Sequence, residues 1–144
     1  TEAGWYQQIE DDGLKITFLP AQHWSKRSVR DGGRRLWGAF MVQADGISLY
    51  YSGDTGYSRH FREIPDLFGA PRWFMQPNHI SPYDALTAST DMKAALTIPM
   101  HYGTFDLSDE PLHDPPLVFA AEAKKRKIDV YIPVLGEVVK LKRM

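Results

Sequence analysis

Apolar positions recur at every second residue in the first third of the chain. The segment 14–19 shows this alternation, and an Asp-Gly turn separates it from the segment 5–10, which we interpret as a strand. A second pair of apolar runs, 37–42 and 47–51, is joined by the Asp-Gly turn at 45–46. Alternation around an Asp-Gly turn is typical of an antiparallel β-hairpin, so these segments predict two hairpins.

Helical spacing of apolar residues begins later in the chain. The segment 59–68 predicts a short helix, which Pro65 shortens or bends because proline interrupts helical hydrogen bonding. Ser81 followed by proline is a typical helix start and predicts a helix through about residue 92. A further helix is predicted over 117–127, where basic residues in the last turn suit the helix dipole.

The remaining segments complete the predicted fold. Residues 72–79 are rich in aromatics and proline without a clear period, and we interpret them as an ordered loop. Residues 96–100 predict a short strand, and 130–134 with 137–141 predict a closing hairpin. Strands followed by alternating strands and helices indicate an α/β fold with a mixed sheet and helices on its outer face.

Composition narrows the class of protein. With 144 residues, 43% of them hydrophobic, the chain has the size of one domain or part of one. A net charge of -1 gives no basic field for nucleic acid. The residues contain no apolar stretch of about 18 residues and no signal-peptide pattern, which favours a cytoplasmic or peripheral-membrane location.

Three residues that can bind metal follow separate apolar runs. Asp54 lies in a Gly-Asp-Thr-Gly loop after 47–51, while His23 and His101 follow two other predicted strands. Without cysteine, a metal in this chain must be held by imidazole and carboxylate, a combination that suits zinc or iron. An ordinary turn is the alternative interpretation of Asp54. His60 and His113 are interpreted as surface or packing histidines.

A cluster of cations follows His23. Two interpretations of this cluster remain open: a solvated loop, or a basic mouth for an anionic substrate. The cationic residues are Lys26, Arg27, Arg30, Arg34 and Arg35.

Five short motifs are specific as a set, although each one alone is common. They are Pro-Ala-Gln-His23-Trp-Ser-Lys-Arg, Leu36-Trp-Gly, Ser-Gly-Asp54-Thr-Gly-Tyr, Pro71-Arg-Trp-Phe-Met-Gln-Pro-Asn-His79 and Ile98-Pro-Met-His101-Tyr-Gly-Thr-Phe-x-Leu-Ser-Asp-Glu110. With these motifs the sequence resembles the metallo-β-lactamase fold hydrolases, and within them the branch that includes N-acyl-phosphatidylethanolamine phospholipase D.

The resemblance implies a role for each matching residue. His23 would complete the three-histidine site of one metal, Asp54 would bridge two metals, and His101 would bind the second. His79 matches an additional active-site histidine of the family. The implied cofactors are two zinc ions, with iron or manganese as alternatives.

The sequence departs from the family pattern at two places. The His-x-His-x-Asp-His motif, which supplies most ligands to both metals, does not occur in residues 1–144. We therefore expect these residues to be the C-terminal portion of a single domain, half of the family's αββα sandwich, and to be inactive alone. Near Ala70, family members usually carry about ten further residues that form an apolar strand, which this sequence lacks.

The resemblance also implies a reaction for the complete protein. We expect metal-assisted hydrolysis of a lipid-like phosphodiester such as N-acyl-phosphatidylethanolamine. Arg27 and Arg72 would pair with the phosphate, and Trp24 and Trp73 would contact an acyl chain. The alternatives are hydrolysis of a lactone or other ester, and a non-catalytic binding module. The expected partners are the N-terminal half and a membrane surface, and homo-oligomer formation stays open.

Overall fold

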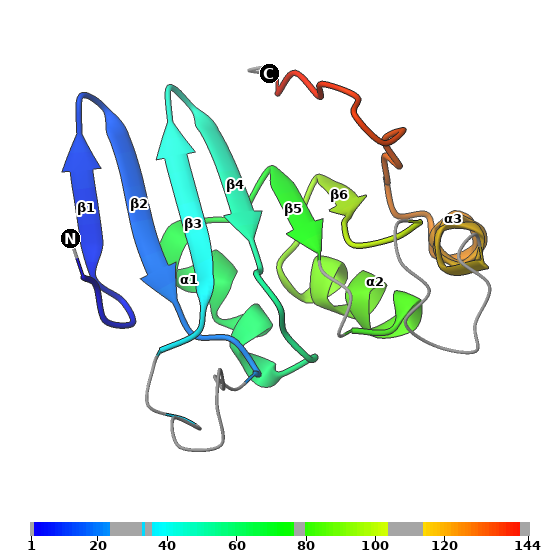
Figure 1. The fold of residues 1–144 in the computed structure, drawn as a ribbon, viewed down its shortest axis with the longest axis horizontal. Coiled ribbons are helices and arrows are strands. Elements are labelled where there is room, and N and C mark those ends of the chain that lie inside the picture. The colour runs from blue at the N-terminus through cyan, green and yellow to red at the C-terminus, as the bar shows by residue number, and fades with distance from the viewer. Residues whose placement is uncertain (1, 24–32, 34–35, 77–79, 104–113, 142–144) are drawn as a thin grey trace.

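The computed structural model describes residues 2–23, 33, 36–76, 80–103 and 114–141. In these residues six strands form one sheet whose spatial order equals their order in the sequence (Figure 1). The elements are β1 (Gln8–Asp11), β2 (Leu14–Leu19), β3 (Ala39–Ala44), β4 (Ile47–Tyr51), the 3-10 helix η1 (Arg59–Arg62), α1 (Ile64–Phe68), β5 (Trp73–Gln76), α2 (Pro82–Asp91), β6 (Leu96–Pro99) and α3 (Asp114–Arg126).

Both hairpins predicted from the alternating pattern are confirmed. Strand β1 pairs antiparallel with β2, and β3 pairs antiparallel with β4. At each turn the aspartate and the glycine after it have positive φ, 44° and 76° for Asp12 and Gly13 and 51° and 75° for Asp45 and Gly46. Two consecutive positive φ angles match the right-handed twist of the flanking strands, which is why Asp-Gly directs a hairpin here.

The prediction that 72–79 is a loop was wrong for residues 73–76. These residues form β5, which pairs parallel with β4 on one side and with β6 on the other. An inner parallel strand contacts apolar neighbours on both faces, so its sequence is continuously apolar and shows no alternation. Four apolar-rich residues close to prolines were therefore too short a pattern to predict a strand. Residues 77–79 lie outside the described part of the chain.

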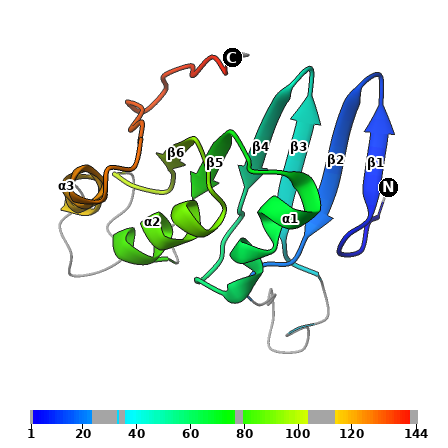
Figure 2. The ribbon, with the colours of Figure 1, turned by 180° about the vertical axis from the view of Figure 1, so that it is seen from behind.

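Helices cover one face of the sheet. Viewed from behind, η1, α1 and α2 lie in front of the strands (Figure 2). The helix predicted from Ser81 is confirmed, and the Ser81 hydroxyl accepts a hydrogen bond from the Asp84 N–H at 3.1 Å. The segment 59–68 is divided into η1 and α1, in agreement with the effect expected from Pro65. The basic end predicted for α3 is also confirmed.

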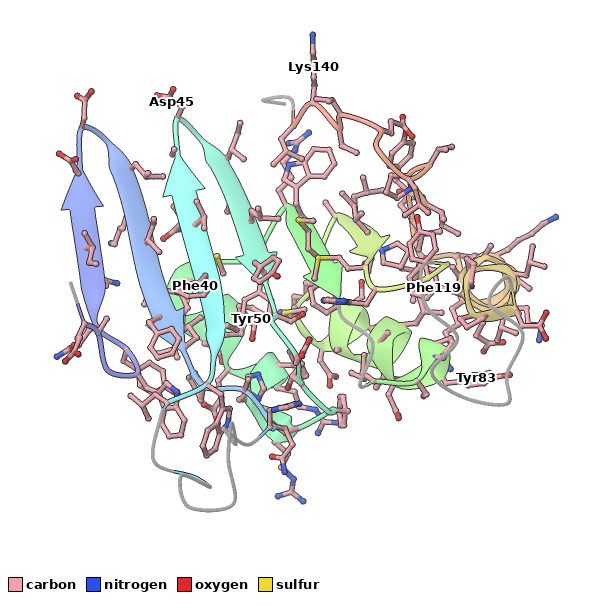
Figure 3. All side chains as sticks on the ribbon, viewed as in Figure 1. Phe40, Asp45, Tyr50, Tyr83, Phe119 and Lys140 are labelled. Atoms are coloured by element: carbon pink, nitrogen blue, oxygen red, sulfur yellow. The ribbon has the colours of Figure 1, made fainter. Side chains whose placement is uncertain are left out.

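The core lies between this helical layer and the middle of the sheet. Tyr50 of β4, Phe74 of β5 and Phe61 of η1 are fully buried, with ring centroids 5.8 to 6.2 Å apart. Phe119 adds an apolar contact from α3 (Figure 3). These contacts hold the carboxyl-terminal half of β4 rigidly against η1.

The opposite face of the sheet is apolar as well. Successive side chains of a strand alternate between faces, so the neighbours of the buried Met41 point away from the helices. On this second face Phe18 and Phe40 are cross-strand partners with ring centroids 5.3 Å apart, and Phe40 is 39% exposed. Val42 pairs with Leu49 in the next row. A sheet with two apolar faces has the composition of an inner layer.

The predicted closing hairpin at 130–141 was wrong. Among the described residues of this segment, β-pairing is limited to an isolated parallel bridge between Val130 and Thr97 of β6. Pro133 has no N–H to continue a ladder, and Val134 and Val138 are 75% and 80% exposed. Gly136 nevertheless forms the predicted turn, in which the Glu137 N–H donates to the Val134 carbonyl at 2.9 Å.

The connection from α1 to β5 is short in the structure. Gly69 ends α1 with a φ of 78°, and β5 begins at Trp73. The expectation that the complete protein carries a further strand near Ala70 stays a prediction.

Candidate functional site

Strand direction gathers the candidate residues at one edge of the sheet. Strand β2 is antiparallel to β3, and β3 is antiparallel to β4, so β2 and β4 run the same way. Strands β5 and β6 are parallel to β4, so all four end at the same edge (Figure 1). His23, Asp54 and His101 follow β2, β4 and β6 at that edge, where α/β sheets commonly place their sites.

The turn that carries Asp54 is fixed to β5 at its beginning. The backbone N–H and the hydroxyl of Ser52 both donate to the Met75 carbonyl, at 3.1 and 2.8 Å. Gly53 follows with a φ of 56°, and a Cβ there would lie 2.5 Å from the Gly38 carbonyl oxygen. Only glycine fits this close approach, which directs the chain out of β4 and towards Asp54.

The same turn is fixed to the segment before His23. Gln22 and Gly56 form an isolated antiparallel bridge, in which the Gly56 N–H donates to the Gln22 carbonyl at 2.9 Å. The buried Thr55 hydroxyl accepts from the Gln22 N–H and donates to the Gly56 carbonyl, each at 2.8 Å. The backbone next to His23 is therefore joined to the Thr55 side chain and to the Gly56 backbone.

Asp54 and His101 approach each other directly. His101 Nε2 lies 3.7 Å from Asp54 Oδ1, and both side chains are about half exposed. His101 has a φ of 57°, a left-handed conformation that a residue with a Cβ adopts at some cost. Strain of this kind persists where the surroundings impose it, and it is frequent at functional sites.

The Asp54 carboxylate and the His101 imidazole could both bind a metal ion, but two ligands do not complete its coordination. Imidazole and carboxylate are ordinary ligands of zinc and iron. Within the part of the chain that the structure describes, no group of three or more His, Asp or Glu side chains is close enough to hold an ion. Of the three candidate ligands, Asp54 and His101 lie within reach of each other, and His23 directly follows Gln22, which is bridged to Gly56 of the same turn.

The residues predicted to bind substrate divide into two groups. Trp24, Arg27 and His79 lie outside the described residues. Arg72 and Trp73 lie at the amino end of β5, opposite the edge that carries Asp54. Arg72 packs its guanidinium 5.8 Å from the Trp73 ring centroid.

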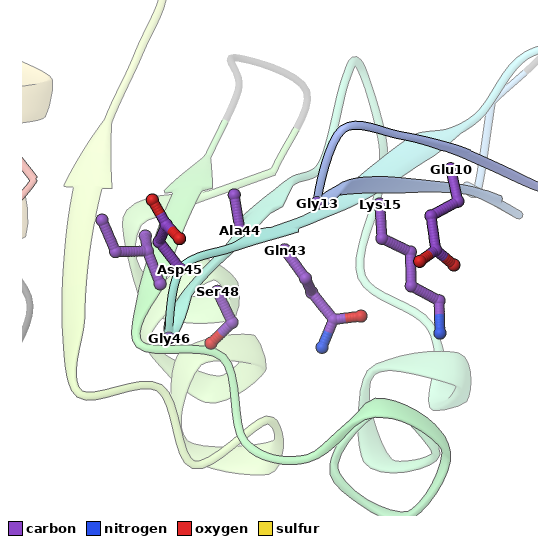
Figure 4. A pocket seen from close by; sticks show the side chains of 9 residues that line it. Glu10, Gly13, Lys15, Gln43, Ala44, Asp45, Gly46 and Ser48 are labelled. Carbon is purple, nitrogen blue, oxygen red and sulfur yellow. The ribbon is translucent and has the colours of Figure 1, made fainter.

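An open hollow of about 470 Å³ also lies away from Asp54. It lies among the turns of the two hairpins, at the other end of the sheet (Figure 4). Its lining includes Glu10, Lys15, Gln43, Asp45 and Ser48.

Two hydrogen-bond networks behind the Asp54 turn were not predicted from the sequence. In one, the Tyr57 hydroxyl donates to Asp91. In the other, His60 contacts Ser58 through Nδ1 and the Tyr50 hydroxyl through Nε2, the latter at 3.2 Å.

His60 has the packing role that its sequence context predicted. Its ring centroid lies 4.2 Å from that of Phe61. Burial lowers the pKa of His60 to about 4, so the imidazole is neutral at pH 7. Burial also raises the pKa of Tyr50 well above its usual range, and the Tyr50 hydroxyl can therefore donate to Nε2.

Comparison with known proteins identifies the family of this chain. Residues 1–102 match the model of the beta-lactamase superfamily domain. A mitochondrial N-acyl-phosphatidylethanolamine-hydrolyzing phospholipase D of Saccharomyces cerevisiae is 32% identical over 94% of this chain. A metal-dependent hydrolase of Methanopyrus kandleri is 33% identical over 88% of it. The chain spans 34% of the length of the yeast relative and 56% of the archaeal one.

A solved structure matches almost the whole chain. Igni18, a metallo hydrolase from Ignicoccus hospitalis, superimposes with a TM-score of 0.79 and 25% identity, over 99% of this chain and 61% of its own. The match confirms the predicted metallo-β-lactamase type of α/β fold. No helix in the described ranges is long and apolar enough to cross a membrane.

Proposed function

This chain belongs to the beta-lactamase superfamily domain family, and from that premise we propose that the complete protein is a metal-dependent phosphodiesterase. Its proposed substrates resemble N-acyl-phosphatidylethanolamine, the lipid named for the yeast relative. The observation that carries the proposal is the 3.7 Å approach of His101 to Asp54. A carboxylate and an imidazole that follow separate strands meet there, and both are common ligands of the metal ions in hydrolytic sites.

Each predicted ligand has a proposed role. His23 and His101 would bind different metal ions, and Asp54 would bridge them through its two carboxylate oxygens. Zinc is the proposed metal, with iron and manganese as alternatives. When bound, such ions lower the pKa of a water molecule and stabilise charge that develops on the substrate. The anchored turn would hold the Asp54 carboxylate in one direction for this purpose.

The open face of the sheet supports a second layer in the complete protein. Phe18, Phe40, Val42 and Leu49 form a continuous apolar surface opposite the helices. Contiguous apolar surface of this kind is usually covered. We propose that the N-terminal half of the same domain covers it, completes the αββα sandwich and brings the remaining metal ligands.

Substrate binding is proposed for the residues that follow His23. Arg27 would pair with the phosphate, Trp24 would contact an acyl chain, and His79 would lie beside the metals. The place of Arg72 and Trp73 at the far end of β5 favours packing for them, and their substrate contact remains a prediction. Hydrolysis would form a bond between the water oxygen and phosphorus and break the bond between phosphorus and the ethanolamine oxygen. The products would be a phosphatidic acid and an N-acylethanolamine, whose oxygen takes up a proton from the water.

The substrate class can be tested on the complete, metal-loaded protein. Four substrates would be compared in parallel: N-acyl-phosphatidylethanolamine, a bis-aryl phosphodiester, an acyl-homoserine lactone and a β-lactam. The proposal expects turnover of the phosphodiesters, with the lipid preferred. Faster turnover of the lactone or the β-lactam would contradict it and favour another hydrolase, while no turnover of any of the four would favour a binding module.

A further inference from the structure

A three-residue network lies directly behind the candidate metal site. The Tyr57 hydroxyl donates to Asp91 Oδ2 at 2.5 Å, and Arg62 Nε donates to the same oxygen at 3.2 Å. Arg62 Nη2 also donates to the Tyr57 hydroxyl oxygen at 3.3 Å. The network therefore joins the end of the Asp54 turn to η1 and to the last residue of α2.

The charges in this network are compensated. The Asp91 side chain is only 17% exposed, so its carboxylate needs hydrogen-bond donors. Arg62 supplies a positive partner from the more exposed side. The bond to Asp91 raises the pKa of Tyr57, which keeps the hydroxyl protonated as a donor.

Tyr57 is also held by its ring. The ring stacks on Phe61, with centroids 5.9 Å apart and planes 27° apart, and Phe61 is a fully buried core residue. Ring and hydroxyl together fix Tyr57 against the helical layer. Ser52 and Tyr57 thus anchor the two ends of the turn that carries Asp54.

We propose that Tyr57, Asp91 and Arg62 are positioning residues that hold the Asp54 carboxylate in the direction that metal binding requires. The inference rests on the proposed function, because it takes Asp54 as a metal ligand. It adds that α2 and η1 contribute to metal affinity although they carry none of the predicted ligands. Groups that bond directly to a metal ligand commonly change metal affinity about 10- to 100-fold, and because this network acts through the backbone of the turn we expect the lower end of that range.

The test compares two tyrosine variants of the complete protein. Tyr57→Phe keeps the ring that stacks on Phe61 and removes the hydroxyl. Tyr131→Phe is the matched control, because Tyr131 also donates to a carboxylate, that of Glu137, and neither residue belongs to the turn that carries Asp54, to η1 or to α2. Co²⁺ would be titrated into metal-free protein and followed by its visible absorption, and the Tm of the metal-free protein would be measured alongside.

The Co²⁺ Kd of Tyr57→Phe should be about 10-fold higher than that of the wild type, and its visible absorption band should be altered. The Kd of Tyr131→Phe should be unchanged. Asp91→Ala should weaken binding similarly, and the Tyr57→Phe/Asp91→Ala double variant should be little worse than either, because the residues act as a unit.

Two results would overturn the inference in different ways. If the Tm of Tyr57→Phe falls while its Co²⁺ Kd and spectrum stay those of the wild type, the network stabilises the fold without positioning Asp54. If the wild-type protein binds no Co²⁺, the proposed metal site is itself contradicted, and the positioning role with it.

Discussion

Gln22 and Gly56 form the bridge that fastens the turn after β4 to the segment before His23. The bridge is reinforced by the buried Thr55 hydroxyl, which bonds to both of its strands. Two ends of different strands are thereby held at a fixed separation, which is the first requirement of a site built from distant parts of a chain.

Thr55→Val should destabilise the protein. Valine has nearly the same shape, but it leaves the Gln22 N–H without the Thr55 acceptor in a partly buried position. The expected loss is about 1–3 kcal/mol in the free energy of unfolding. Thr90→Val is the matched control, because the Thr90 hydroxyl bonds to the Leu86 carbonyl on an exposed part of α2. Equal losses in urea denaturation of the two variants would contradict the role assigned to Thr55.

Asp54→Asn should remove most of the hydrolytic activity and leave the fold intact. Asparagine has the same size but carries no negative charge, so it cannot bridge two cations. Because the Asp54 side chain is about half exposed, the substitution should change the Tm by only a few degrees. Circular dichroism and turnover of the bis-aryl phosphodiester would be measured together. Activity near that of the wild type would contradict the bridging role.

Stability should fall as the pH is lowered through the titration of His60. The pKa of this imidazole is about 4 in the folded protein and 6.5 when it is unperturbed. Between these values the unfolded chain binds the proton more readily, so the free energy of unfolding decreases from pH 6.5 to pH 4.

The contribution of His60 can be isolated by substitution. His60→Gln removes the titrating group, and the Tm of this variant should depend less steeply on pH between 6.5 and 4 than that of the wild type. Parallel Tm curves for the two proteins would show that another group carries the dependence.

Local chemistry explains which parts of the fold the sequence predicts. The hairpins follow from Asp-Gly turns, and α2 follows from Ser81, because these signals act over a few residues. Strand β5 was not predicted, because the strands it pairs with, β4 and β6, are distant in sequence. The hairpin predicted around Gly136 fails for a related reason: a good turn does not supply a partner for the strands on either side.

Some contacts of the candidate site could also be predicted from the sequence, and others could not. Asp54 and His101 could be predicted to meet, because both follow strands that share one direction. The contact between Tyr57 and Asp91 could not, since it depends on how α2 packs against η1. Arg72 was expected to pair with the phosphate because of its positive charge. The parallel register places it at the end of β5 opposite the Asp54 turn, a position that the sequence alone did not indicate.

Phe40 tests whether the open face is an inner layer. Phe40→Asp in the complete protein should cost about 3 kcal/mol or more, because a covered charge replaces an aromatic contact with Phe18. Leu67→Asp on α1 is the control, since Leu67 is already 55% exposed, and it should change stability by about 0.5 kcal/mol or less. Similar small losses for both variants would mean that the face remains open to water.

The most direct test of the proposed metal site is the metal content of the complete protein, purified without chelators. Elemental analysis should find about two transition-metal ions per wild-type chain, and clearly fewer in Asp54→Asn, because the bridging carboxylate contributes to both sites. A wild-type content below about one ion per chain, or an Asp54→Asn content equal to that of the wild type, would contradict a metal centre built on Asp54.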